Sequence, residues 1–179
     1  YITLEMAEER IAERIDANLF DVTMDDLHDM PKQLYDTKLD KLNAKTNGKL
    51  IIKEYPTASA HSGHFRALMN ELALKKSFKP DVVFIDYLNI CASARFKGGN
   101  ISSYFYIKAI AEELRGLAVE FDLPIFTATQ TTRTGFVSTD IGLEDTSESF
   151  GLPATADFMF ALMSNEELEA LGQMKVKQL

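Results

Sequence analysis

Residues 82–88, which read VVFIDYL, constrain the fold of this chain more than any other segment. A continuous apolar run rich in β-branched side chains predicts a strand buried on both faces, as in a parallel sheet. Asp86 lies at the end of this run, so its carboxylate is expected at the rim of the sheet, where α/β proteins bind ligands. Burying a carboxylate is costly unless a cation or several donors meet it. A phosphate-bound Mg²⁺ is the partner that this arrangement most often serves.

Length and composition indicate one ordinary globular domain. The chain has 179 residues, 46% of them hydrophobic, which is enough for a sizeable core. No apolar run approaches the length of a membrane span, and no signal peptide opens the sequence. The single cysteine, Cys91, excludes an internal disulfide framework and fits a reducing cytoplasm.

The charge is acidic overall but unevenly distributed. A net charge of −8 argues against a protein that coats nucleic acid by bulk attraction. Residues 1–30 hold nine acids and two bases, residues 31–80 hold ten bases and four acids, and residues 134–173 hold eight acids and no base. These segments suit solvated faces. Alternatively, they form opposing edges that attract neighbouring copies.

Strand patterns alternate with helix patterns along the chain. Strands are expected at residues 1–4, 49–55, 81–85, 124–129 and 158–163. Helices are expected at residues 7–18, 24–30, 32–46, 62–76 and 101–121, near 147–151, and after Ser164. Thr23, Ser62 and Ser164 are the expected caps, and His61 and His64 suit capping or surface roles better than metal binding. The alternation predicts an α/β fold with a mostly parallel sheet flanked by helices.

Three expected strands end in residues that could perform chemistry together. Glu5, Asp86 and Gln130 each follow a strand, and the carboxyl ends of parallel strands share one rim. This set suits nucleotide hydrolysis, in which Glu5 polarises the attacking water, Asp86 holds the Mg²⁺ shell and Gln130 detects the terminal phosphate. Each residue alone has an ordinary alternative; Glu5, for example, could simply favour the start of a helix.

The phosphate-binding loop that such chemistry requires does not occur in this sequence. That loop reads Gly-x-x-x-x-Gly-Lys-Ser/Thr between a strand and a helix. The one Gly-Lys pair is Gly48-Lys49, where Asn43 replaces the first glycine and Leu50 replaces the hydroxyl residue. The pair also precedes an expected strand, so it is interpreted as a turn.

Several motifs in order resemble the RecA-like motor domain of the DnaB-family replicative helicases, most closely the bacteriophage members. The residues that carry the resemblance are Leu4-Glu5-Met6, Phe84-Ile85-Asp86-Tyr87-Leu88, Thr129-Gln130, Arg133, Asp145, Glu148, Ser149, Gly151, Ala156 and Asp157. They span nearly the whole chain, and their order is specific although no single motif is.

The resemblance implies an ATP-dependent DNA helicase that works as a ring hexamer on single-stranded DNA, in the cytoplasm of a bacterial host, with a primase and a helicase loader as partners. It implies that Glu5 is catalytic, that Asp86 is on the Mg²⁺ side, and that Gln130 couples the γ-phosphate of ATP or another NTP to the DNA loops. Residues 92–103 and 131–145 match the two central-channel loops. Arg95, Lys97 and Arg133 are therefore candidate DNA contacts, because phosphates bind cationic side chains.

Residues 1–179 depart from the family pattern in lacking the Walker A phosphate loop, the arginine-finger segment and the N-terminal collar domain. The sequence also opens directly on a strand and closes without a stop signal, so we expect a P-loop NTPase core truncated at both ends and inactive by itself. Two alternatives stay open: a recombinase-type or clock-type ATPase with the same core, and a catalytically inactive α/β scaffold that acts only in assembly.

Overall fold

The computed structural model describes residues 1–96, 101–131, 142–145 and 151–179, and its centre is a four-stranded parallel sheet. The strand order is β2-β1-β3-β4, with bounds Lys53–Glu54, Ile2–Thr3, Val83–Asp86 and Ile125–Thr127. A separate antiparallel pair joins β5 (Phe160–Met163) to β6 (Lys175–Gln178). The predicted parallel α/β sheet is confirmed.

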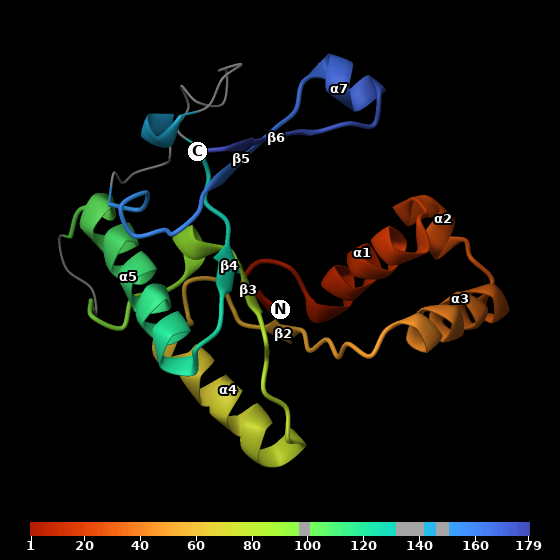
Figure 1. Cartoon of the computed structure of the whole chain (residues 1–179), viewed down its shortest axis with the longest axis horizontal. Helices are drawn as coiled ribbons and strands as arrows, with labels where there is room; N and C mark the ends of the chain where they lie inside the picture. Colours follow the sequence, from red (N-terminus) through yellow and green to blue (C-terminus); the bar gives the residue numbers. More distant parts are fainter. Residues whose placement is uncertain (97–100, 132–141, 146–150) are drawn as a thin grey trace.

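Figure 1 shows the sheet between two groups of helices. The helices are α1 (Glu8–Phe20), α2 (Met24–His28), α3 (Lys32–Lys45), α4 (Ser62–Lys76), α5 (Ser103–Phe121) and α7 (Glu166–Ala170), with short 3₁₀ turns at Leu88–Ile90 and Leu143–Asp145. Helices α4 and α5 lie beside the sheet, whereas α1, α2 and α3 form an arm that extends away from it. No helix in the described ranges is long and apolar enough to cross a membrane.

The main core lies between the sheet and helices α4 and α5. Its largest fully buried side chains include Phe65 of α4, Ile85 of β3, and Ile110 and Leu117 of α5. These positions follow the helical period in α5 and alternate along β3, so each element turns its apolar side chains to the same interior.

The opposite face of the sheet is open, and the prediction that residues 82–88 form a strand buried on both faces is wrong. Phe84 is 41% exposed and Phe126 is 52% exposed. The two rings stack with centroids 5.1 Å apart, and Tyr1 stacks on Phe84 at 6.2 Å. Helices α4 and α5 cover one face only, so alternation along β3 buries Val83 and leaves Phe84 outside.

Helix starts were predicted better than the residues that cap them. Thr23 caps α2 as expected, since its hydroxyl accepts a hydrogen bond from the Asp26 N–H. The predicted caps Ser62 and Ser164 are wrong, because His61 caps α4 and Asn165 caps α7. The ring of His61 accepts from the Gly63 N–H at 3.1 Å, which agrees with the capping role expected for the histidines.

The predicted strands differ from the observed ones mainly at β2, β5 and β6. The strand expected at residues 49–55 shortens to β2, and the one expected at 158–163 shortens to β5. Strand β6 was not predicted; it pairs along the whole of β5, from Phe160 opposite Gln178 to Met163 opposite Lys175. The helix expected near residues 147–151 falls almost entirely outside the described residues.

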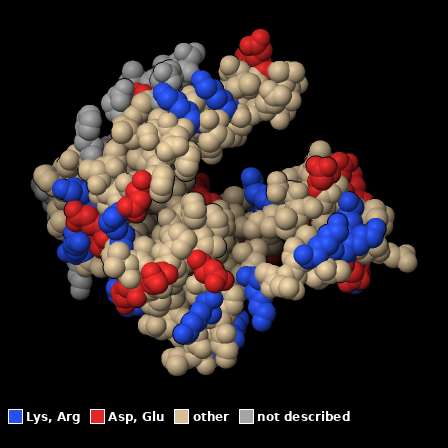
Figure 2. Space-filling view, viewed as in Figure 1, with Lys and Arg blue, Asp and Glu red and all other residues tan. Residues whose placement is uncertain are grey.

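The arm carries the charge asymmetry that the sequence predicted. Its small core is formed by Ala17, Phe20 and Leu27, against which Tyr35 of α3 packs. Figure 2 shows basic side chains gathered over α3 and acidic ones over α2. Helix α3 contains no buried residue, and its lysines are exposed except Lys38, which is half-buried and donates to the Phe20 carbonyl at 3.1 Å.

We predict that Leu117→Ala lowers the free energy of unfolding by about 2–5 kcal/mol, because a fully buried leucine leaves a cavity in the core. Denaturant unfolding followed by circular dichroism measures this change. The matched control is Val119→Ala on the same helix, which is 75% exposed and should change stability by less than about 0.5 kcal/mol. Equal effects of the two substitutions would contradict the assigned core.

Candidate functional site

The carboxyl ends of β1, β3 and β4 lie next to one another at one edge of the sheet. All three strands are parallel, and Thr3 is paired with Asp86 while Ile85 is paired with Thr127. Glu5 and Gln130 follow β1 and β4 at this edge. The topology therefore brings the three predicted chemical residues to the same rim of the sheet, as their positions in the sequence required.

Asp86 is half-buried and has a specific neighbour. The Tyr1 hydroxyl donates to Asp86 Oδ2 at 2.6 Å, and the Leu4 N–H donates to the Asp86 carbonyl oxygen at 2.9 Å. Burial, and then the Asp86 hydrogen bond and charge, raise the pKa of the Tyr1 phenol. The peptide bond between Asp86 and Tyr87 is cis.

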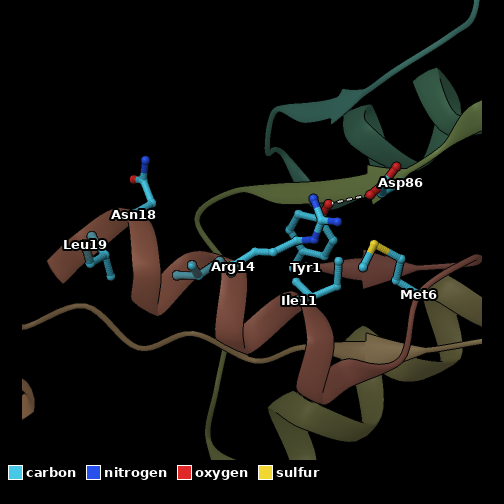
Figure 3. Close-up of a pocket in the computed structure, with 8 residues that line it drawn as sticks. Tyr1, Met6, Ile11, Arg14, Asn18, Leu19 and Asp86 are labelled. Atoms are coloured by element: carbon cyan, nitrogen blue, oxygen red, sulfur yellow. Dashed lines mark hydrogen bonds between the residues drawn. The ribbon is translucent and has the colours of Figure 1, made fainter. Parts of the chain in front are cut away.

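A pocket of about 310 Å³ opens beside Asp86, between the sheet and α1 (Figure 3). Figure 3 shows Arg14 reaching from α1 toward the Tyr1 ring, with Met6 on the other side of that ring. The lining residues are Tyr1, Met6, Ile11, Arg14, Ile15, Asn18, Leu19 and Asp86. A guanidinium and a carboxylate in its lining give this pocket groups of both signs.

Glu5 is exposed just beyond β1, in a tightly held turn. The Met6 N–H donates to Thr3 Oγ1 at 3.1 Å, and the Thr3 hydroxyl donates to the Met6 carbonyl at 2.8 Å. The Thr57 hydroxyl donates to the Leu4 carbonyl at 2.6 Å. The backbone on both sides of Glu5 is therefore fixed, while its carboxylate contacts no hydrogen-bond donor among the described residues.

Gln130 is exposed and turned toward the residue after Asp86. Its Nε2 donates to the Tyr87 hydroxyl at 3.0 Å, and the preceding Thr129 hydroxyl donates to Asn89 Oδ1 at 2.8 Å. These bonds tie the end of β4 to the segment that follows β3. The pocket next to Asp86 is lined by neither Gln130 nor Glu5, so the three side chains share an edge without sharing that cavity.

A Mg²⁺ ion at this edge would meet one half-buried carboxylate, that of Asp86. The described residues contain no group of three or more acidic, histidine or cysteine side chains arranged to hold a metal ion. Mg²⁺ keeps several waters and is bound by one or two carboxylates plus substrate phosphates. Asp86 fits the water-mediated role, and a phosphate would have to supply the remaining ligands.

Arg95 is the one predicted DNA contact that the structure describes; Lys97 and Arg133 lie outside the described residues. Its guanidinium forms an ion pair with Glu112, and Lys108 lies 3.9 Å from the same carboxylate. These side chains line a groove of about 670 Å³ with Phe96 and Phe105. Cations beside exposed aromatic rings are typical of surfaces that bind single strands.

Glu113 is a site residue that was not predicted from the sequence. Its carboxylate accepts hydrogen bonds from the hydroxyls of Ser62 and Ser93 and from the N–H groups of Ala94 and Arg95. Although burial acts to raise the pKa of Glu113, these hydrogen bonds outweigh it and lower the pKa. The available signal was an acid directly beside the apolar stripe of α5, a position where water does not fully solvate a charge.

The parallel sheet flanked by helices is the fold expected of a RecA-like core, and comparison with known proteins agrees. The family profile described as "DnaB-like helicase C terminal domain" matches residues 1–174. The DnaB-like replicative helicase of Enterobacteria phage T4 is 48% identical over 182 residues, covering 100% of this chain and 38% of that protein. The chain therefore belongs to the DnaB-like helicase C-terminal domain family.

Two solved structures share the fold at low sequence identity. One is described as "The Structure Of A DnaB-Like Replicative Helicase And Its Interactions With Primase", with a TM-score of 0.73, 19% identity, and coverage of 94% of this chain and 41% of that one. The other, described as an ATPase domain, has a TM-score of 0.72, 19% identity, and coverage of 94% of this chain and 61% of that one. The recombinase-type and clock-type alternatives are replaced by the family assignment.

Proposed function

We propose that this chain is part of the motor of a replicative DNA helicase, which hydrolyses ATP or another NTP to move along single-stranded DNA as a ring hexamer. The identity of 48% to a DnaB-like replicative helicase carries this proposal. The placement of Glu5, Asp86 and Gln130 at adjacent strand ends supports it independently.

The nucleotide side of the proposal assigns one task to each strand-end residue. Glu5, exposed and free of hydrogen-bond donors among the described residues, acts as the base that polarises the attacking water. Asp86 holds Mg²⁺ through its water shell, and the ion would neutralise charge on the phosphates. Gln130 responds to the terminal phosphate and passes the signal to Tyr87, which it already contacts.

The proposal places this chain within a longer protein. The chain spans 38% of the length of the T4 relative. The phosphate loop, the arginine finger and the N-terminal collar domain are then supplied by other parts of the full-length protein. Residues 1–179 alone should not hydrolyse nucleotide, because that loop makes most of the charge-assisted hydrogen bonds to phosphate.

The proposed partners are single-stranded DNA, neighbouring copies in the ring, a primase and a helicase loader, met in the cytoplasm of a bacterial host. Arg95, Lys97 and Arg133 are the proposed DNA contacts. The solved helicase that is described with its primase interactions has the same fold as this chain. The basic α3 and acidic α2 provide complementary charge for contacts between copies.

We predict that Glu5→Gln in the full-length protein leaves nucleotide binding intact but reduces kcat by about 10²- to 10⁴-fold, because the water loses its base. Single-turnover hydrolysis and a fluorescent-nucleotide titration measure the two quantities. The control is Glu9→Gln, an exposed acid in the first turn of α1, which should hydrolyse normally. Retained turnover in Glu5→Gln would remove Glu5 from this role and favour an inactive scaffold.

We predict that Asp86→Asn raises the Mg²⁺ concentration needed for half-maximal turnover and lowers kcat, because an amide binds the hydrated ion more weakly than a carboxylate. Turnover measured across a Mg²⁺ titration tests this. Tyr1→Phe is the control, since it removes the hydrogen bond to Asp86 and keeps the carboxylate. An unchanged Mg²⁺ titration in Asp86→Asn would reject the metal assignment.

We predict that Arg95→Gln weakens the binding of single-stranded DNA and reduces the slope of log K against log salt by about 0.7 to 1, the value for one phosphate contact. Fluorescence anisotropy with an oligothymidylate at several salt concentrations measures both. Lys76→Gln at the far end of α4 controls for net charge. A slope equal to that of the unmodified protein would exclude Arg95 from phosphate contact.

A further inference from the structure

Two neighbouring carboxylates of α5 hold the segment that carries Arg95, and they do so in different ways. Glu113 binds the backbone and hydroxyls of residues 93–95, whereas Glu112 binds the Arg95 guanidinium. Glu113 therefore fixes the backbone of Arg95, and Glu112 fixes the position of its guanidinium. The proposed DNA loop begins at this point.

The Glu113 contacts form a complete anchor. The Ser93 hydroxyl donates at 2.6 Å, the Ser62 hydroxyl at 2.9 Å, the Ala94 N–H at 2.9 Å and the Arg95 N–H at 3.3 Å. Both carboxylate oxygens take part, and the donors come from α4 and from the loop. A carboxylate that accepts several hydrogen bonds is held as the anion and in one orientation.

Further bonds fix the same segment from its two sides. The Ser93 N–H donates to the Tyr106 hydroxyl of α5 at 3.1 Å, and the Ala92 N–H donates to the Ala60 carbonyl before α4 at 2.8 Å. Residues 92–95 are thus attached to both helices that cover the sheet. Arg95 is the last of these anchored residues, and its side chain is 51% exposed.

Glu112 lies beside this anchor, and its side chain is 37% exposed. Its carboxylate pairs with Arg95 and lies within ion-pair distance of Lys108. A carboxylate and a phosphate present similar oxygens to a guanidinium. A phosphate that binds Arg95 through Nη1 would therefore displace Glu112, and an exposed ion pair costs little to break.

We propose that Glu113 is a positioning residue for DNA binding and that Glu112 is a placeholder for the DNA phosphate on Arg95. This inference rests on the proposed function. Glu113 holds the Arg95 backbone so that its side chain starts from one fixed point, which lowers the entropy lost when a phosphate binds. Glu112 keeps the guanidinium paired until the strand arrives.

The two adjacent acids should respond oppositely to the same substitution, measured in the full-length protein by oligothymidylate anisotropy across a salt series. Glu113→Gln keeps the side-chain size but replaces one acceptor by an amide donor that opposes the N–H groups. We expect the Kd to rise about tenfold. The salt slope should fall by the same amount as in Arg95→Gln, which a merely lower folded fraction would not produce.

Glu112→Gln should lower the Kd by about two- to fivefold, because the competing carboxylate is gone. This gain should disappear when Arg95→Gln is added, and Arg95→Gln should add no further loss to Glu113→Gln. Ser93→Ala, which keeps the carboxylate and removes one hydroxyl, should weaken DNA binding in the same direction as Glu113→Gln. Thermal unfolding of Glu112→Gln should match that of the unmodified protein, because an exposed ion pair adds little stability.

The outcomes separate this inference from the function on which it rests. If the unmodified full-length protein does not bind the oligonucleotide, both the helicase proposal and the placeholder role fail. Suppose instead that the unmodified protein binds the oligonucleotide and that Arg95→Gln weakens this binding. The positioning role alone then fails if Glu113→Gln binds DNA normally, or if its loss of affinity adds to that of Arg95→Gln. A Glu112→Gln gain that survives in the Arg95→Gln background overturns the placeholder role.

Discussion

The pairing of β1 with β3 is the constraint on which the rest of the structure depends. Strand β1 has only two residues, yet it is bonded on both sides, to β2 and to β3. Its register places Thr3 opposite Asp86, and the Leu4 N–H extends the ladder to the Asp86 carbonyl. A slip of one residue would turn the β1 side chains to the opposite faces. Glu5 and Asp86 reach the same edge only because this register is held.

The same alternation explains why Asp86 lies beside a pocket and not in the core. Phe84 and Asp86 are two residues apart on β3, so they point to the face opposite Val83 and Ile85. That face is not covered by α4 or α5, and Tyr1 lies over it, stacking on Phe84 and donating to Asp86. The carboxylate therefore avoids full desolvation, which is costly for a charged group.

The sequence predicted those features that depend on local patterns. The central strands, the long helix α5 and the meeting of three strand ends follow from apolar periodicity and parallel topology. Features that depend on contacts between residues far apart in the sequence were not predictable. Ser62 looks like a cap, but its hydroxyl is taken by Glu113 of α5, which leaves His61 to cap the helix. Strand β6 was not predicted because two of its four residues are lysines, which give no apolar strand pattern. The strand depends on its pairing with β5. The roles of Glu5, Asp86 and Gln130 stay predictions, since their shared edge does not by itself establish chemistry.

Glu112 and Glu113 are neighbouring glutamates whose carboxylates have different partners because they point in different directions from α5. Successive residues on a helix point about 100° apart, so one carboxylate turns toward the junction of α4 with the loop and the other toward Arg95 and Lys108. The first meets backbone and hydroxyl donors from two separate elements, and it becomes structural. The second meets cationic side chains that water can also solvate, and its pairing stays weak. Since the anchored residues 92–95 follow β3 through the turn at Leu88–Ile90, the same short segment connects Asp86 to Arg95.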